Sequence, residues 1–353
     1  MTMAVTPDEL PVPPLVEWVL TWGLGARGFG KEEKRAWLVP FAYQGRRCSI
    51  GLYKFGLRLH VQASAEETPV VASNIIRAID KAVRVAESEV LLEYAEGQVR
   101  AGNLTVKNQY HMFHNMYWDF RSQLEPSNSA GGEVQPADEA RSLKDIVDRM
   151  NDNIRTDRGR FHVSVAMVNA YFSLLEHLLV LVWPLMGGYR PGVDDAEEMI
   201  ASRWSDKFKT VFDISADRSA KHIYDRLHDV AEEFRNTYDH GGFDKRRGSL
   251  FVHFPGGAIP ASLSKSRHRL RTNFFPVAEP EISDLLQVFG EVDEWLRVGP
   301  ASFAMKFVEA GIDVPFNAAW LDELRQEMTT EEHFEGHLMG LARYLDDQYN
   351  MDW

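Results

Sequence analysis

The sequence predicts a mainly α-helical protein (α+β overall), with a helical bundle and a small N-terminal β-hairpin or sheet region. Apolar residues recur at three- and four-residue spacing through most of the chain, whereas the one clear early β pattern is confined to residues 34–63. A length of 353 residues is enough for about two domains. We therefore expect a small α+β region followed by a larger helical domain.

The N-terminal region, residues 1–124, contains the predicted strands and the first long helices. Residues 34–63 mix β-branched and aromatic side chains around a turn at Gly45, which predicts two or three short strands. Apolar residues then follow a helical period over residues 68–124. The expected core positions at the start of that helical segment are Ile75, Ile76, Ile79, Val83 and Ala86.

A polar segment separates this region from the rest of the chain. Residues 125–137 are rich in Pro, Gly and Ser, so we predict a domain linker or a long exposed loop there. The helical domain, with a C-terminal helical extension, is expected over residues 138–353. Its predicted helices span residues 138–153, 160–186, 194–212, 217–240, 280–297, 301–310 and 329–348.

Composition excludes several classes of protein. An apolar content of 44% with 26% charged residues is typical of a folded globular chain rather than a disordered one. A formal charge of −13 argues against a surface that coats nucleic acid or anionic membrane as a whole. The single cysteine, Cys48, and a start without the pattern of a secretion signal indicate a reducing, cytoplasmic setting. Residues 163–186 are long enough to cross a bilayer, but their Asn, Glu and His side chains favour a buried helix and no membrane.

The stretch RNTYDHGG closes the predicted helix over residues 217–240. Asn236 and His240 are four residues apart and share the helix side that faces away from the apolar stripe, while Arg235 lies at the flank of that stripe. A purely structural interpretation is also open. Arg235 and Asp239 are four residues apart and can form a surface pair worth about 0.2–0.5 kcal/mol, and a His in the last turn suits the helix dipole.

The string RNTYDHG resembles the RNxxxHG form of the Arg-x4-6-His motif of HEPN domains. The apolar helix AYFSLLEHLLVLVWPL, with Glu176 midway along it, resembles the helix that precedes the motif in that family. The resemblance covers about residues 138–245. It implies a HEPN-like helical bundle that cuts single-stranded RNA without metal or other cofactor, commonly as a homodimer. Toxin and defence systems are the usual setting of the family, which implies an antitoxin or regulatory protein as a partner.

The residues themselves suit this chemistry. A ribose 2′-OH is a nucleophile already placed beside the scissile phosphorus, so the protein need only move protons and stabilise charge. We expect His240 to move the protons, because imidazole titrates near neutral pH, and Arg235 to bind the phosphate oxygens. Asn236 is expected to support catalysis, and Glu176 and Asp239 are supporting candidates. A buried Glu176 that only bonds a neighbouring helix is an equally open interpretation.

Local charge agrees with an RNA site although the net charge does not. Between Arg235 and Arg271 eight Lys or Arg stand against two acids, a net of +6. The run KSRHRLR is either a phosphate-tracking loop or a solvated turn. The RNA-binding candidates are Lys245, Arg246, Arg247, Arg267, Arg269 and Arg271.

No metal site is expected. His111 and His114, and likewise His333 and His337, have spacings found in metal sites, but no third ligand is evident for either pair. Two further hypotheses therefore stand beside the nuclease: a catalytically inactive HEPN-like module that binds RNA, a nucleotide or a protein, and a structural helical scaffold whose RNTYDHGG segment is only a capped helix end.

Overall fold

The computed structural model describes residues 1–125, 143–235, 249–255, 257–263, 270–271 and 279–351. The chain forms two compact units. The N-terminal unit comprises Met1–Asn103 and Thr329–Trp353, and the helical unit comprises Leu104–Met328. The linker that we predicted at residues 125–137 falls within the range of the helical unit, and residues 126–137 lie outside the described part of the chain.

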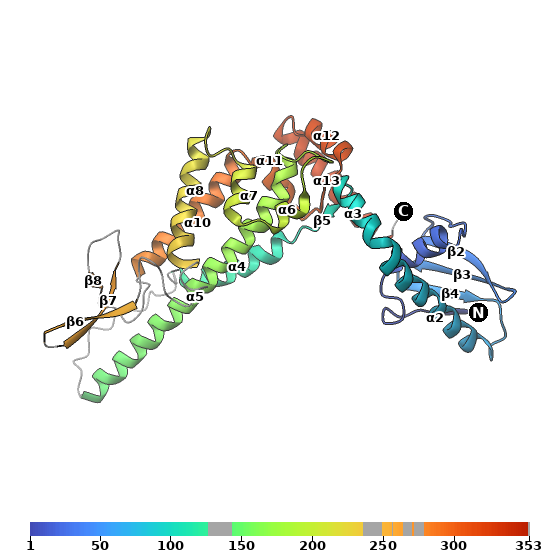
Figure 1. The fold of residues 1–353 in the computed structure, drawn as a ribbon, viewed down its shortest axis with the longest axis horizontal. Coiled ribbons are helices and arrows are strands. Elements are labelled where there is room, and N and C mark those ends of the chain that lie inside the picture. The colour runs from blue at the N-terminus through green and yellow to red at the C-terminus, as the bar shows by residue number, and fades with distance from the viewer. Residues whose placement is uncertain (126–142, 236–248, 256, 264–269, 272–278, 352–353) are drawn as a thin grey trace. The chain divides into compact units, whose positions relative to one another are not determined.

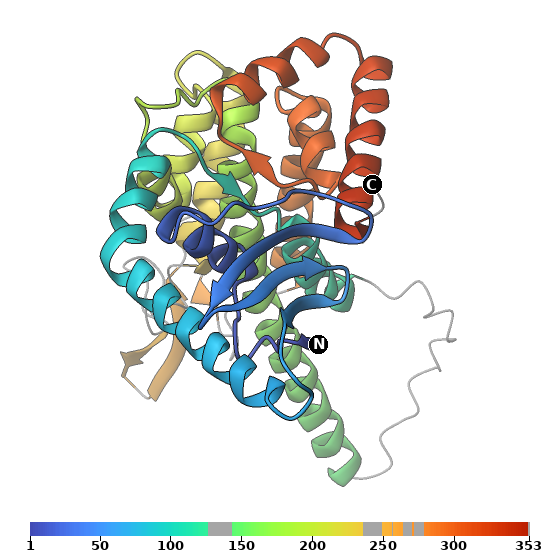
Figure 2. The ribbon, with the colours of Figure 1, turned by 90° about the vertical axis from the view of Figure 1, so that its right-hand side faces the viewer.

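The N-terminal unit consists of an antiparallel sheet, two long helices and shorter helical segments (Figures 1 and 2). Its strands pair in the order β1-β4-β3-β2. The strands are β1 (Thr2–Ala4), β2 (Arg35–Tyr43), β3 (Arg46–Tyr53) and β4 (Gly56–Val61). The helical segments are α1 (Pro13–Trp18), the π-helical turn η1 (Val19–Gly23), α2 (Thr68–Ala86), the π-helical turn η2 (Glu87–Leu91), α3 (Leu92–Arg100) and α13 (Glu331–Asn350).

Alternation along the strands gives the sheet one buried face. Val39, Ile50 and Leu59 are fully buried, and they share a core with the inward face of α2. The predicted core positions Ile75, Ile76 and Ile79 belong to this core.

The predicted turn at Gly45 is confirmed, because Gly45 has a φ of 76° and joins β2 to β3. Pro40, which has no N–H to donate, lies on the edge strand β2.

The helical unit packs its helices around α5, which carries many of its buried residues. Its helices are α4 (Tyr110–Leu124), α5 (Leu143–Leu185), α6 (Ala196–Ala201), α7 (Trp204–Val211), α8 (Arg218–Val230), the π-helical turn η3 (Ala231–Arg235), α10 (Glu279–Val298), α11 (Ser302–Glu309) and α12 (Ala318–Glu327). Its strands are β5 (Thr105–Val106), β6 (Ser249–Phe254), β7 (Gly257–Leu263), β8 (Leu270–Arg271) and β9 (Val314–Pro315), which form a three-stranded sheet β6-β7-β8 and the pair β5-β9.

The mainly α-helical class with a small N-terminal sheet is confirmed, but several helix boundaries differ from the prediction. The helices predicted at 138–153 and 160–186 are one helix, α5, because the intervening segment contains no proline and exposed polar residues can continue a helix. The helix predicted at 194–212 is two, α6 and α7, separated by extended backbone at Ser202 and Arg203. The helical segment 68–124 is interrupted after α3, where Gly102 takes a φ of 77° and ends the helix.

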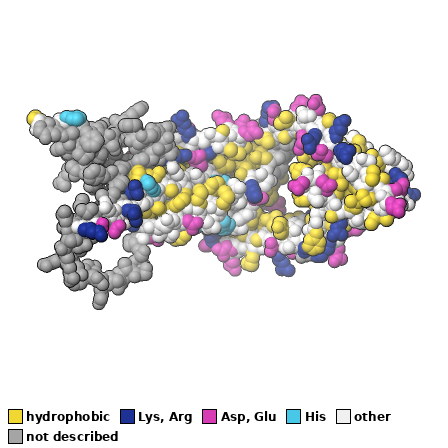
Figure 3. Space-filling view, turned by 90° about the horizontal axis from the view of Figure 1, so that it is seen from below, with side chains coloured by type: hydrophobic (Ala, Val, Ile, Leu, Met, Phe, Trp, Pro, Cys, Tyr) yellow, Lys and Arg dark blue, Asp and Glu magenta, His cyan; other side chains and the backbone are white. Residues whose placement is uncertain are grey.

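One helix is long and apolar enough to cross a membrane by length and composition, among the residues that the structure describes. It spans Arg155–Leu185, and most of its apolar window is buried inside the protein. Figure 3 also shows hydrophobic side chains gathered on the surface of the helical unit; those exposed on α4 are Met112, Met116 and Trp118.

Candidate functional site

Arg235 lies at the end of a helix that begins and packs as its sequence predicts. Asp217 caps α8 by accepting hydrogen bonds from the N–H groups of Ser219 and Ala220. The predicted apolar stripe is buried at Leu227 and at Phe234. After Val230 the helix widens into the π-helical turn η3, and such widened turns are frequent at functional sites. Arg235 is the last residue of that turn.

Glu176 of α5 holds Arg235 from the neighbouring helix. The Oε1 atom of Glu176 lies 2.9 Å from Nη2 of Arg235, within salt-bridge distance. The two side chains are 26% and 28% exposed, so the pair is neither free surface nor closed core. The guanidinium carbon of Arg235 also lies 5.1 Å from the ring centroid of Phe172, one turn before Glu176 on α5. Glu176 and Phe172 therefore fix the position of Arg235 from two directions.

Lys207 of α7 is a second cation on the same carboxylate. Its Nζ atom lies 3.3 Å from Oε2 of Glu176, and its side chain is only 5% exposed. One carboxylate thus bridges two cations, which leaves this cluster of described side chains with a net charge of +1. We call Phe172, Glu176, Lys207 and Arg235 the bridged cluster.

Lys207 is not among the site residues predicted from the sequence. A signal was available, because Trp204, Lys207 and Phe208 fall at three- and four-residue spacing on α7 and all three are buried. A lysine on the inward stripe of a helix requires an anionic partner. The carboxylate embedded in the apolar stretch of α5 supplies that partner.

His177, next to Glu176, has a structural contact. Its Nε2 atom accepts a hydrogen bond of 2.9 Å from the backbone N–H of Gln109, immediately before α4, and its ring lies 5.1 Å from that of Phe113. Burial lowers the pKa of His177 from its usual value, and the positive charge of Lys207 lowers it further. The neutral ring is the form that can accept this bond, so His177 joins α5 to the start of α4.

A second polar group in the helical unit centres on Asp293 of α10. Its Oδ1 atom accepts a hydrogen bond of 3.0 Å from the hydroxyl of Tyr171. Burial raises the pKa of Asp293 to about 6, although the Tyr171 hydroxyl and Arg297 oppose this shift. Tyr171 is itself fully buried and stacks on Phe289 with ring centroids 3.8 Å apart. We interpret this hydrogen bond and ring stacking as structural contacts that hold α5 against α10.

Most of the other predicted site residues lie outside the described part of the chain. These residues are Asn236, Asp239, His240, Lys245, Arg246, Arg247, Arg267 and Arg269. Arg271 is described only as a residue of β8, where it pairs with Ser262. Of the predicted catalytic and supporting residues, the structure therefore brings together Arg235 and Glu176.

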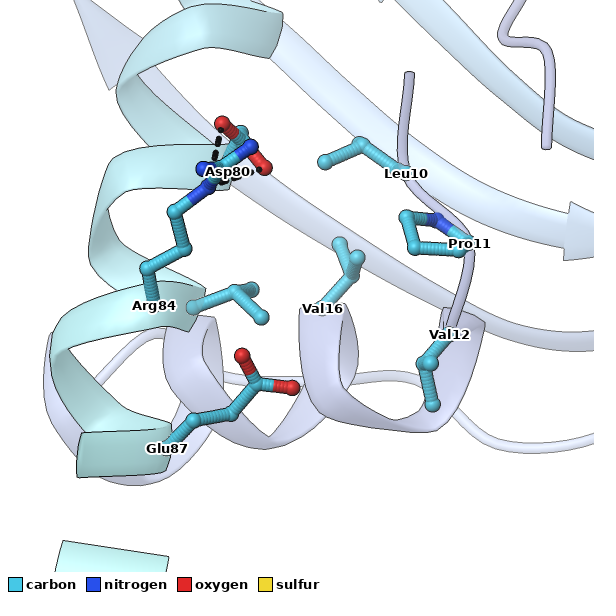
Figure 4. Close-up of a pocket in the computed structure, with 8 residues that line it drawn as sticks. Leu10, Pro11, Val12, Val16, Asp80, Arg84 and Glu87 are labelled. Atoms are coloured by element: carbon cyan, nitrogen blue, oxygen red, sulfur yellow. Dashed lines mark hydrogen bonds and ion pairs between the residues drawn. The ribbon is translucent and has the colours of Figure 1, made fainter. Parts of the chain in front are cut away.

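A pocket lined by apolar and charged side chains is a separate feature. It has a volume of about 270 Å³ in the N-terminal unit, where Leu10, Pro11 and Val16 face the helix that carries Asp80 and Arg84 (Figure 4). Its two central charges already pair with each other, with Nε of Arg84 3.1 Å from Asp80. Asp80, Arg84 and Glu87 are the charged side chains that line it, and none of the site residues predicted from the sequence is among its lining.

Within the described ranges, no three His, Cys, Asp or Glu side chains are grouped so that they could hold a metal ion.

The sequence matches no protein-family model, and comparison with curated proteins and with solved structures finds no similar protein. The candidate site accordingly depends on the geometry of the bridged cluster and on the motif to which Arg235 belongs.

Proposed function

We propose that this protein is a metal-independent endoribonuclease of the HEPN type, in which Arg235 and His240 act on single-stranded RNA. One observation carries the proposal most directly. Arg235 of the RNTYDHG motif is held against the apolar helix by Glu176, the polar residue that the resemblance singled out midway along that helix. A positioned, partly exposed guanidinium is the group that a phosphate-binding site needs.

The bridged cluster gives Arg235 two properties that suit transition-state stabilisation. Glu176 engages one edge of the guanidinium, and Phe172 lies against it, so little reorganisation is needed when a phosphate binds. Lys207 shares the same carboxylate, so Glu176 does not cancel the positive charge of the cluster. The remaining N–H groups of Arg235 are then available for the charge that develops on the phosphate oxygens.

The reaction follows from these roles. His240 takes the proton of the 2′-OH, the 2′ oxygen attacks phosphorus, and the 5′ oxygen leaves after it receives a proton. The products are a 2′,3′-cyclic phosphate and a 5′-hydroxyl end. Asn236 orients His240 or the phosphate, and Asp239 orients the imidazole. The basic residues Lys245, Arg246, Arg247, Arg267, Arg269 and Arg271 bind the flanking backbone.

A homodimer belongs to this proposal, because a second copy supplies a second Arg235 and His240 to one cleft. Control by an antitoxin or regulatory protein, and action in the cytoplasm, belong to it as well. These statements depend on the resemblance alone.

A catalytically inactive HEPN-like module is the second candidate, and one observation favours it. Glu176 already forms a salt bridge of 2.9 Å with Arg235. An arginine paired in this way can have a purely structural role, which here would be to join η3 to α5. In that case the Arg235 and Glu176 pair stabilises the bundle, and the chain binds its partner without cutting it.

Purified protein should be incubated with end-labelled single-stranded RNA in the presence of EDTA. We expect wild-type protein to cut, and Arg235→Ala and His240→Ala each to reduce the rate by about 10²- to 10⁴-fold. Arg218→Ala is the matched control, since Arg218 is exposed at the start of the same helix, and it should cut as wild type does. Undiminished cleavage by the Arg235→Ala, His240→Ala double variant would exclude this site. Binding of RNA with no cleavage by any protein would support the inactive module.

A further inference from the structure

The N-terminal unit holds a concentration of positive charge that the nuclease proposal does not use. Residues 26–62 contain eight Lys or Arg and two acids, a net of +6 within a chain of −13. This segment forms β2, β3 and β4 and the loop before them. By contrast, α2, η2 and α3 together contain four Lys or Arg and five acids. The positive charge therefore belongs to the sheet and not to the helices that follow it.

The sheet has a second face that α2 does not cover. Residues that pair directly across antiparallel strands point to the same side, and Ser49 pairs with both Pro40 and His60, while Gly51 pairs with both Leu38 and Arg58. Successive residues alternate sides, so Arg47 shares this side with Ser49. The core residues Val39, Ile50 and Leu59 lie on the opposite side. We call the side that carries Arg47, Ser49, Arg58 and His60 the open face.

The open face is hollowed and accessible. A shallow groove of about 430 Å³ is lined by Phe29, Leu38, Pro40, Arg47, Ser49 and His60, among others. Phe29 extends the sheet beyond β2 through two backbone hydrogen bonds with Leu38, and 50% of its surface is exposed. Residues of three strands and the preceding loop thus meet in one open groove.

The two arginines of the open face have no carboxylate partner among the residues that the structure describes, whereas those at its margins do. Arg35 pairs with Glu32 at 3.0 Å, and Arg46 pairs with Glu67 at 3.2 Å. Arg47 and Arg58 are exposed, and the guanidinium carbon of Arg58 lies 5.6 Å from the Tyr53 ring centroid. Exposed arginines without a carboxylate partner can bind the phosphate groups of an anionic polymer.

Aromatic rings flank these cations. Phe29 lines the groove, Tyr53 lies beside Arg58, and Phe55, in the turn between β3 and β4, is 84% exposed. His60 hydrogen-bonds with the hydroxyl of Thr2 at 2.7 Å, and burial lowers its pKa, so a neutral ring stands between the two arginines. Rings interleaved with unpaired arginines are the features by which proteins hold single strands, since bases stack on rings and phosphates meet guanidinium groups.

We propose that the open face of the N-terminal sheet binds single-stranded nucleic acid, with phosphates on Arg47 and Arg58 and a base stacked on Phe29. An anionic bilayer would also meet the positive charge, but a groove with an aromatic side chain in its wall suits separate bases better than a flat lipid surface. The proposal does not depend on cleavage. A strand bound here remains bound whether or not the helical unit cuts RNA.

The test uses the full chain carrying His240→Ala, so that RNA stays intact whatever the activity of the wild type. Fluorescence anisotropy with labelled 12-nucleotide U-rich RNA, the same sequence as DNA, and an RNA duplex measures Kd at several salt concentrations. We expect both single strands to bind more tightly than the duplex. Arg47→Ala with Arg58→Ala should raise Kd at least about tenfold and reduce the slope of log Kd against log salt by about 1.4, the value for two lost phosphate contacts to a single strand.

Matched variants separate this effect from a loss of folding or charge. Arg77→Ala with Lys81→Ala removes the same charge from the exposed side of α2 and should leave Kd within about twofold. Phe29→Ala should raise Kd about fivefold or more, and Phe29→Tyr should restore it, because the ring and not its polarity provides the stacking. An unchanged Kd and salt slope after the loss of Arg47 and Arg58 would overturn the proposal. Tighter binding to the duplex, or binding only to vesicles that contain anionic lipid, would overturn it as well.

Discussion

The arginine side chains of interest have opposite surroundings in the two units. In the helical unit Arg235 is 28% exposed and shares a carboxylate with the buried Lys207. In the N-terminal unit Arg47 and Arg58 stand on an open sheet face with no acid paired to them among the described residues. The first arrangement fixes one guanidinium in place, which suits chemistry at one phosphate. The second leaves cations solvated and adaptable, which suits a backbone that can slide or shift.

The difference has an energetic basis. A buried lysine without an anion is costly, so Glu176 is needed for folding as well as for positioning Arg235. Arg47 and Arg58 are exposed and pair with no acid among the described residues, so the fold should depend on them far less than on Glu176. Changes in the bridged cluster should therefore alter stability, whereas changes on the open face should alter binding.

Glu176→Leu should destabilise the helical unit by about 3–5 kcal/mol, because it leaves Lys207 buried without its counter-charge. Urea unfolding followed by circular dichroism measures this loss. Adding Lys207→Met to Glu176→Leu should recover part of it, since the pair is then replaced by apolar side chains. Glu323→Leu, at an exposed position of α12, is the control and should change stability by less than about 0.5 kcal/mol. A Glu176→Leu protein as stable as this control would show that the bridged cluster is dispensable.

Asp293→Asn should stabilise the protein at pH 8, by about 1–3 kcal/mol. Asp293 is buried beside Tyr171, and its pKa rises from the usual 3.8 to about 6. The protonated form is thus favoured by folding, so the stability that this group contributes is complete below pH 3.8 and is lost as the pH rises through 6. Thermal unfolding from pH 4 to 8 should show the gain of Asp293→Asn growing with pH. A constant difference between the two proteins would contradict this assignment.

The contribution of His177 to stability should change with pH in the opposite direction to that of Asp293. Its pKa is lowered in the folded protein, so its contribution to stability is present above its ordinary pKa of 6.5 and is lost as the pH falls through the folded value. Protonation also removes the acceptor that holds the Gln109 N–H, a bond worth about 1 kcal/mol. His177→Gln should flatten the fall in unfolding free energy below pH 6.5. If the variant shows the same acid slope as wild type, another group is responsible.

Arg47→Ala and Arg58→Ala should have the smallest effect on folding. Neither side chain pairs with an acid among the described residues, so each should change the unfolding free energy by less than about 0.5 kcal/mol. Differential scanning calorimetry of the single variants checks this. A loss of more than 1 kcal/mol, on the order of a buried hydrogen bond, would mean that the open face is part of the folding core.

Periodicity predicted the elements whose burial follows a simple rule. The strands around Gly45, the core face of α2 and the apolar stripe of α8 follow from one-sided burial at a period of two or 3.6 residues. Helix ends were harder to predict, because the pattern of apolar residues shows neither the exposed polar segment through which α5 continues nor the extended backbone at Ser202 and Arg203. The short helix α12 was missed although Asn317 caps it by accepting hydrogen bonds from two backbone N–H groups.

The site could be predicted in part. The sequence indicated Arg235 as a catalytic residue and Glu176 as a supporting one, and the two side chains lie 2.9 Å apart. It did not indicate Lys207, for which the sequence offers one signal, the helical spacing with Trp204 and Phe208. The burial of that stripe is known only from the structure. The open face could not be inferred either, since partial alternation within 34–63 gives no strand order, and the order decides which arginines share a side.

The most direct test of the nuclease proposal uses an oligonucleotide that is DNA except for one ribose, incubated with the protein in EDTA. The account predicts cleavage only on the 3′ side of that ribose, with a 2′,3′-cyclic phosphate as the first product detected by mass spectrometry. His240→Ala should lower the rate of this cleavage by about 10²- to 10⁴-fold. Cleavage of the all-DNA strand, or a product with a 3′-hydroxyl and a 5′-phosphate, would contradict it, because neither can arise from attack by the neighbouring 2′-OH.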